Sequence, residues 1–121
     1  MFKDLNVWKR SFALVKLVYL EMRNCKDRGF VDQITRSAVS VPSNIAEGSE
    51  RGSNKDFVKF LYIAKGSCGE LATQLLLAGE LGYIAKDKAI ELELEALTIC
   101  KMIGGLISAK CVAPVAGKRK D

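Results

Sequence analysis

Hydrophobic positions recur every three to four residues in four separate segments, and each segment is expected to form an amphipathic helix. The predicted ranges are about 5–24, 31–47, 53–81 and 86–110. The third is the most regular, because steps of four and three alternate without error through Phe57, Leu61, Ala64, Cys68, Leu71, Leu75 and Ala78, with Leu81 following on the same face. Four such helices with short connections predict an all-α fold, an antiparallel up-down-up-down four-helix bundle.

The first and last helices carry more apolar width than one bundle core needs. In the first, the expected core row is Trp8, Phe12, Val15, Tyr19 and Met22, widened by Val7, Leu14, Leu17, Val18 and Leu20. In the last, the row is Leu92, Ala96, Ile99, Ile103 and Leu106, widened by Ile90, Leu94, Leu97 and Ile107. The surplus predicts an exposed apolar patch and therefore a homo-oligomer, either a dimer or a closed ring.

Proline and glycine mark the expected irregularities. Pro42 lies inside the second helix, whose core row is Val31, Ile34, Ala38, Val41 and Ile45, so a kink or break is expected there. Gly29 and Gly82 suit helix ends, and Ser53 suits a helix start. Five further glycines fall inside predicted helices, at an expected cost of about 1 kcal/mol each, and close helix approach is the expected reason: Gly66, Gly69, Gly79, Gly104 and Gly105.

Length and composition predict a single domain. The chain has 121 residues, which predicts one bundle domain over 1–112 followed by a disordered basic tail over 113–121. We expect no signal peptide and no membrane span, because charged residues interrupt every apolar stretch. The four cysteines, Cys25, Cys68, Cys100 and Cys111, form no C-x-x-C pair, so reduced thiols in a cytoplasmic protein are expected.

The sequence contains no histidine, which narrows the possible chemistry. Nucleophiles activated by histidine are excluded, and so is the commonest zinc ligand. A di-iron site of the Glu-x-x-His type is excluded as well. Glu91, Glu93 and Glu95 are spaced by two, so on a helix they point in different directions. We therefore expect no enzyme activity, no metal and no cofactor.

The net charge of +5 is concentrated near the two ends of the sequence. Residues 1–29 carry seven Lys or Arg against three Asp or Glu, and residues 113–121 carry three against one. Lys9, Lys16 and Arg23 are seven residues apart and share one side of the first helix, with Arg10 beside them and Lys26 and Arg28 at its end. Such a row suits phosphate binding without sequence preference, and equally a solvated helix face. No clear aromatic interleaving suited to stacking unpaired bases accompanies it.

A second polar row follows the other side of the second helix. Arg36, Ser40, Asn44 and Glu47 step by four, four and three, away from the apolar row. One interpretation is a ligand or RNA contact beside Pro42. The other, which we favour, is a hydrogen-bonded network that fixes helix register or an interface between subunits.

The segment Gln33–Gly48 resembles a signature of the 23S rRNA intervening-sequence proteins. Further matches follow in order over roughly residues 2–110, at Phe2, Asp4, Leu5, Val7, Trp8, Phe57, Phe60, Leu61, Ala64, Gly66, Ser67, Glu70, Leu71, Gly82, Tyr83 and Ile84. The resemblance implies a bacterial four-helix bundle, often a pentamer, with no established enzymatic activity or agreed catalytic residues.

The same resemblance suggests two kinds of partner. Some relatives are encoded within insertions in ribosomal RNA genes and others stand alone in bacterial genomes. The first setting favours binding of RNA or another nucleic acid, and the six cations above are the candidate contacts. A related branch comprises accessory proteins of diversity-generating retroelements, which bind a reverse transcriptase. A protein-interaction scaffold is therefore the alternative function, and a salt titration of nucleic-acid binding separates the two.

Overall fold

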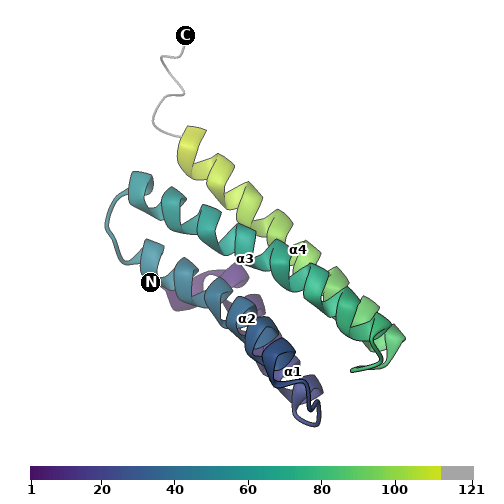
Figure 1. The fold of residues 1–121 in the computed structure, drawn as a ribbon. Coiled ribbons are helices and arrows are strands. Elements are labelled where there is room, and N and C mark those ends of the chain that lie inside the picture. Colours follow the sequence, from purple (N-terminus) through teal and green to yellow (C-terminus); the bar gives the residue numbers. More distant parts are fainter. Residues whose placement is uncertain (113–121) are drawn as a thin grey trace.

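The computed structural model describes residues 1–112, which form four α-helices preceded by a short 3-10 turn (Figure 1). The turn η1 spans Phe2–Asp4. The helices are α1 (Asn6–Met22), α2 (Arg28–Ser49), α3 (Asn54–Glu80) and α4 (Lys86–Val112). The described residues contain no strand, and the predicted all-α four-helix bundle is confirmed. The tail expected over 113–121 lies outside the described residues.

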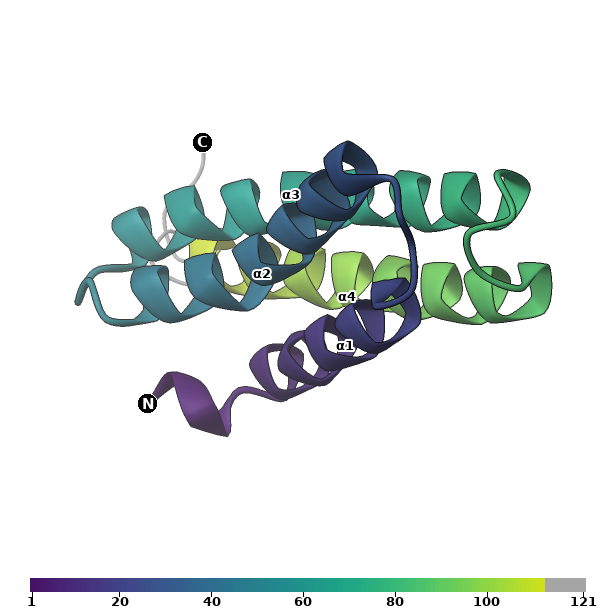
Figure 2. The ribbon, with the colours of Figure 1, turned by 60° about the horizontal axis from the view of Figure 1, so that its bottom comes forward.

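The bundle consists of two antiparallel helix pairs of unequal length. Figures 1 and 2 show the long pair, α3 and α4, with the shorter α1 and α2 lying against it. α3 is the central helix, since it packs extensively on both α4 and α2. α1 packs mainly on α2 and more lightly on α4. Consequently α1 makes less contact with the rest of the bundle than α2, α3 or α4 does.

The core row of α3 is the one predicted. Phe57, Leu61, Ala64, Cys68, Leu71, Leu75 and Ala78 are all buried. Leu81 departs from the expectation and is 51% exposed. The reason is that α3 ends at Glu80, so Leu81 lies at the C-cap where the chain turns toward α4.

The predicted core row of α1 is displaced by one residue over most of the helix, although Met22 is buried as predicted. The buried positions are Val7, Ser11, Leu14, Val18 and Met22, whereas Trp8 and Val15 are only half-buried. Phe12 and Tyr19 are 47% and 51% exposed. Both rows are largely apolar and recur with helical spacing, and they differ by a rotation of about 100° around the helix. Periodicity alone could not show which of the two rows is buried, because that depends on how α1 packs on α2.

Pro42 does not interrupt α2, which is continuous from Arg28 to Ser49. Of the two expected outcomes, a break is wrong and a kink agrees with Figure 2, which shows the ribbon of α2 changing direction about half-way along its length. Proline removes one backbone hydrogen bond. Pro42 itself and its neighbours Val41 and Ile45 are buried, so packing holds the helix together at this point.

The helix ends confirm two expectations and correct one. The side chain of Ser53 accepts a hydrogen bond from the backbone N–H of Asp56, as expected for the start of α3. Gly82, directly after the α3 C-cap, has a φ of 77°, in the region that favours glycine. Gly29 does not end a helix. It belongs to the first turn of α2, because Asp27 is the N-cap and accepts from the N–H of Phe30.

Close packing explains some helix glycines and not others. A Cβ atom on Gly79 would lie 2.6 Å from the Cβ of Ala89 on α4, so α3 and α4 need glycine there. Gly48 of α2 is also required, because a Cβ atom there would lie 2.7 Å from the Cβ of Phe60 on α3. A Cβ on Gly66, Gly69 or Gly105 would meet nothing within 4 Å. The expected close approach is therefore wrong for these three within the described chain.

The cysteines are free thiols in different environments. Cys68 is fully buried between α3 and α4, and its Sγ donates to the carbonyl oxygen of Ala96 at 3.1 Å. Burial raises the pKa of the Cys68 thiol well above its ordinary value. Cys25 and Cys100 are half-buried, and Cys111 is exposed. Among residues 1–112, no helix is long and apolar enough to cross a membrane.

Candidate nucleic-acid interface

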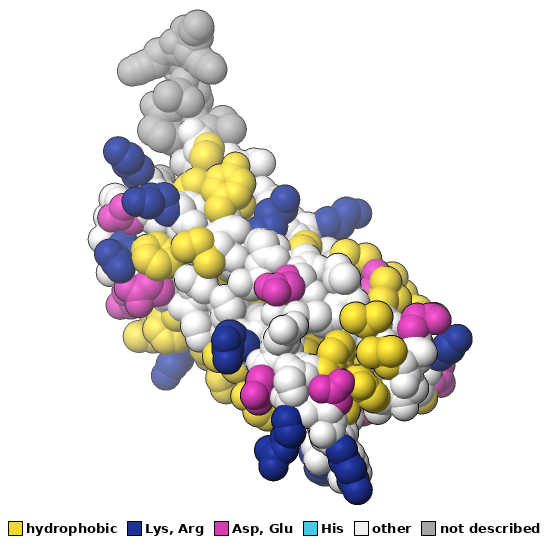
Figure 3. Space-filling model, viewed as in Figure 1, with side chains coloured by type: hydrophobic (Ala, Val, Ile, Leu, Met, Phe, Trp, Pro, Cys, Tyr) yellow, Lys and Arg dark blue, Asp and Glu magenta, His cyan; other side chains and the backbone are white. Residues whose placement is uncertain are grey.

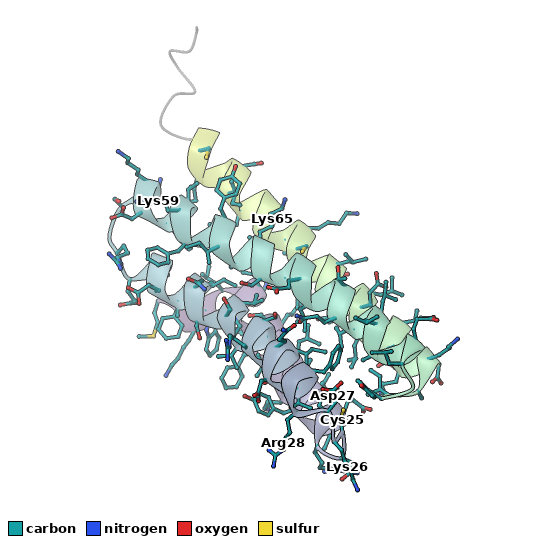
Figure 4. The ribbon with its side chains drawn as sticks, in the orientation of Figure 1. Cys25, Lys26, Asp27, Arg28, Lys59 and Lys65 are labelled. Atoms are coloured by element: carbon teal, nitrogen blue, oxygen red, sulfur yellow. The ribbon has the colours of Figure 1, made fainter. Side chains whose placement is uncertain are left out.

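Three of the predicted cations gather where α1 turns into α2. Arg23, Lys26 and Arg28 line a surface hollow of about 560 Å³. Figure 4 shows Lys26 and Arg28 extending outward from this turn, and Figure 3 shows basic side chains at the same end of the molecule with acidic ones nearby. Asp32 lines the hollow as well. The hollow, called the basic hollow below, can hold an anion against several cations.

The remaining cations lie along α1 and differ in how they are engaged. Lys9 and Lys16 are exposed. Arg10 is paired with Glu95 of α4, and its Nε donates to Glu95 Oε2 at 2.9 Å. This bidentate contact raises the pKa of Arg10, first through the hydrogen bond and then through the opposite charge. Arg10 thus joins α1 to α4, and its charge is less available to a phosphate than those of Lys9 and Lys16.

The polar row on α2 divides into two parts in the structure. The hydroxyl groups of Ser40 and Ser67 lie 2.8 Å apart and connect α2 to α3. The Asn44 amide donates to the Ser40 carbonyl at 2.8 Å and to its hydroxyl at 2.9 Å. Glu47, in contrast, pairs with Arg51 one turn further along. Ser40 and Asn44 therefore form a network with α3, while Glu47 lies on the surface outside it.

Arg36 lies at a separate polar hollow between α2 and α3. This hollow, of about 420 Å³, is lined by Gln33, Arg36, Ser37, Ser40, Ser67 and Glu70. No carboxylate of the described residues lies within ion-pair distance of Arg36. Further along the same face of α3, the buried side-chain oxygen of Gln74 has no hydrogen-bond partner among the described atoms.

An apolar groove beside α1 is the feature that sequence reasoning missed. It encloses about 340 Å³ and is lined by Phe2, Trp8, Phe12, Val15, Lys16, Val39, Pro42, Ser43 and Ala46. The rings of Trp8 and Phe12 are stacked with their centroids 4.9 Å apart, and Phe2 contacts Trp8 edge-on at 5.2 Å. Its sequence signal was the spacing of four between Trp8 and Phe12, which was assigned to the core.

Asp27 and Tyr83 connect the two helix pairs close to the basic hollow. The Tyr83 hydroxyl donates to Asp27 Oδ2, and the rings of Phe30 and Tyr83 meet edge-on at 5.2 Å. The hydrogen bond from Tyr83, followed by that from the N–H of Phe30, lowers the pKa of Asp27. The turn that carries Lys26 and Arg28 is thereby fixed to the loop between α3 and α4.

The helical region matches one known protein family. The sequence profile of the 23S rRNA-intervening sequence proteins matches residues 3–105. The chain belongs to this family. The matched region includes every candidate residue on α1 and α2, so the two hollows, and the apolar groove except for Phe2, lie within the part of the chain that matches the 23S rRNA-intervening sequence proteins.

A solved structure agrees with this assignment. It is the crystal structure of a protein with unknown function from the S23 ribosomal protein family of Bacteroides thetaiotaomicron. The two chains are 26% identical and superpose with a TM-score of 0.75, over 84% of this chain and 97% of the other. A search of the curated proteins gives no match. Sequence and fold thus agree in relating this chain to the 23S rRNA-intervening sequence proteins, and neither comparison names a catalytic reaction.

Proposed function

We propose that this protein is a non-catalytic, self-associating four-helix bundle that binds RNA through cations on α1 and at the α1–α2 turn. The observation that carries the proposal is the basic hollow. Arg23, Lys26 and Arg28 come from the end of α1, the turn and the start of α2, and they meet around one cavity. Cations that converge on a concave surface can contact neighbouring phosphates of one backbone.

Self-association would strengthen this binding. Large apolar side chains remain exposed toward the end of the α3–α4 pair, at Leu76, Leu77, Leu81, Ile90 and Leu94. Figure 3 shows hydrophobic side chains gathered over this end of α3 and α4. A contiguous apolar surface of this kind is typical of an interface. Several copies in one assembly would present several basic hollows to one RNA and so raise its affinity.

Filter binding of RNA at increasing salt concentration tests the proposal. Replacing Arg23, Lys26 and Arg28 together by Gln should weaken binding and reduce the slope of log K against log salt by about 2 for a single strand. The matched control replaces three exposed lysines distant from the hollow, Lys55, Lys59 and Lys101, by Gln. It removes the same charge and should change binding far less. Equal losses in both variants would contradict the assignment of the hollow.

Light scattering tests the self-association. We expect a mass well above 13.3 kDa for the wild type, five times larger if the assembly is the pentamer implied by the family resemblance. Leu77→Ser combined with Leu81→Ser should reduce the mass. Leu20→Ser, at a residue of similar exposure on α1, should leave it unchanged. A wild-type monomer at micromolar concentration would refute this part of the proposal.

The exposed apolar end of the α3–α4 pair also supports a second function. A protein-interaction scaffold, such as an accessory partner of a retroelement reverse transcriptase, would use that surface to bind another protein. In this case RNA retention should be absent at physiological salt, and the Gln variant of the basic hollow should behave as the wild type.

A further inference from the structure

Cations and aromatic rings alternate along the exposed side of α1, which corrects the expectation that no aromatic interleaving accompanies these cations, because Phe12 and Tyr19 were assigned to the core and are exposed. Lys9, Phe12, Lys16, Tyr19 and Arg23 follow one another in steps of three, four, three and four, which places them in one row along the helix. All five are exposed. At 1.5 Å per residue the row is about 21 Å long. The helix therefore presents each aromatic ring between two positive charges.

One end of this row continues into the apolar groove. Phe12 stacks on Trp8, which is supported by Phe2, so three rings form a continuous aromatic surface. The Nζ of Lys16 lies 5.7 Å from the centroid of the Phe12 ring. This contact shows that the ring can be reached by a cation from the solvent side. Lys16 is the one charged residue among those that line the groove.

The other end of the row continues into the basic hollow. Tyr19 and Arg23 both line that hollow, together with Lys26 and Arg28. From Leu5 to Leu20 the sequence contains no acidic residue, so the row itself carries positive charge alone. Glu21, beside its far end, is half-buried, and Asp32 lies within the hollow. The groove, the row and the hollow thus form one continuous surface along α1.

We propose that this row binds single-stranded nucleic acid, with unpaired bases stacking on Phe12 and Tyr19 and phosphates pairing with Lys9, Lys16 and Arg23. The inference rests on the proposed RNA binding and specifies its form. Aromatic rings alternating with cations are the arrangement used to hold single strands without sequence preference. In a duplex the bases are already paired and stacked, so only the cations would contribute.

The position of Lys16 is compatible with this mode of binding. Its contact with Phe12 is an exposed cation–π interaction, which is weaker than stacking of a base on an aromatic ring. An arriving base would therefore displace the ammonium group. Lys16 has a flexible side chain, so the displaced charge can move to the phosphate beside that base.

Trp8 provides a direct measurement, because it is the single tryptophan of the chain. A short single-stranded RNA of mixed sequence should quench its fluorescence as a base stacks next to it on Phe12. Inorganic polyphosphate should compete for the cations without quenching, since it carries no bases. A duplex RNA of the same length should bind with salt dependence and quench far less.

The critical variant is Phe12→Leu, which keeps an apolar side chain and removes the ring. It should weaken single-strand binding about tenfold and leave duplex binding unchanged. Tyr19→Leu should act in the same direction, and Phe12→Tyr should restore binding. The control is Leu20→Ala, since Leu20 is 48% exposed on the same helix but lies outside the row. Circular dichroism of each variant verifies that it is folded.

Three results would overturn the inference. The first is equal affinity of wild type and Phe12→Leu for single strands. The second is equal quenching by polyphosphate and RNA. The third is a change in Trp8 emission with protein concentration in the absence of RNA, which would assign the groove to a second copy of the chain. If both RNAs bind with a steep salt dependence in any of these cases, the proposed function stands and only the stacking is refuted.

Discussion

α1 and α3 are both amphipathic helices, yet they use their apolar residues differently. α3 lies between α2 and α4 and buries its predicted row except for Leu81. α1 lies at the edge of the bundle and buries one row while leaving Phe12 and Tyr19 exposed. α3 leaves aliphatic side chains such as Leu76 and Leu77 exposed, whereas the exposed apolar side of α1 includes aromatic rings flanked by cations. A peripheral helix can combine a buried side that holds it in place with an outer side that binds a partner.

The largest expected difference between the two helices is in how much a Leu→Ala substitution lowers the free energy of unfolding. Leu61 of α3 is fully buried, so Leu61→Ala should lower the free energy of unfolding by about 2–5 kcal/mol. Leu20→Ala on α1 should change it by about 0.5 kcal/mol or less, because that side chain is 48% exposed. Urea unfolding followed by circular dichroism measures both. Similar losses in the two variants would mean that α1 is buried against another chain.

Two glycines within α3 allow a similar comparison between a tightly packed position and an open one, with smaller expected effects on stability. Gly79→Ala should destabilise the protein by about 1–3 kcal/mol, because the new methyl group would meet Ala89 on α4. Gly69→Ala should stabilise it by up to about 1 kcal/mol, since the space around Gly69 is open and alanine favours helix. Thermal unfolding should show shifts of opposite sign. A destabilising Gly69→Ala would indicate that a second copy packs closely on that position.

The connection between α2 and α3 should show a weaker effect. Ser67→Ala removes the hydrogen bond to Ser40 and should cost about 0.5–1.5 kcal/mol of unfolding free energy. RNA binding per folded molecule should not change, because Ser67 lies outside the α1 row. A loss of RNA affinity at unchanged stability would instead assign Ser40 and Ser67 to a binding role.

The smallest effect is expected at Asp27, which joins the two helix pairs through Tyr83. Its pKa is lowered in the folded state from an ordinary value of 3.8, so its ionised form stabilises the fold above that pH. The contribution disappears as the pH falls through the lowered pKa. Asp27→Asn should therefore unfold with a shallower dependence on pH below about 4. Identical acid profiles for the two proteins would exclude this role.

The fold could be predicted from the sequence because each of the four segments carries an apolar row with helical spacing that only packing side by side can bury. In α3 one apolar row runs the length of the helix with regular spacing, and that row is the buried one, while Ile63, Leu76 and Leu77 lie outside it and are exposed. In α1 two adjacent apolar rows compete, and the choice depends on how α2 lies against it. The start of α2 was placed three residues too late, because the capping role of Asp27 is visible only once the turn geometry is known.

The candidate site was predictable only in part, because residue spacing shows which side chains share a helix face but not which faces meet in the fold. The spacing of Lys9, Lys16 and Arg23 identified the basic side of α1, and the structure adds the hollow that unites Arg23 with Lys26 and Arg28. The exposure of Phe12 and Tyr19 was hidden, because aromatic residues with helical spacing are normally core residues. The pairing of Arg10 with Glu95, 85 positions away in sequence, depends on tertiary contact alone.

The buried thiol of Cys68 has a practical consequence. Its sulfur lies between α3 and α4, where burial keeps it protonated and out of reach of solvent. A thiol reagent can modify it only when these two helices separate, whereas exposed Cys111 reacts in the closed bundle. The rate at which Cys68 is modified, relative to Cys111, therefore reports how often the long helix pair opens in the native protein.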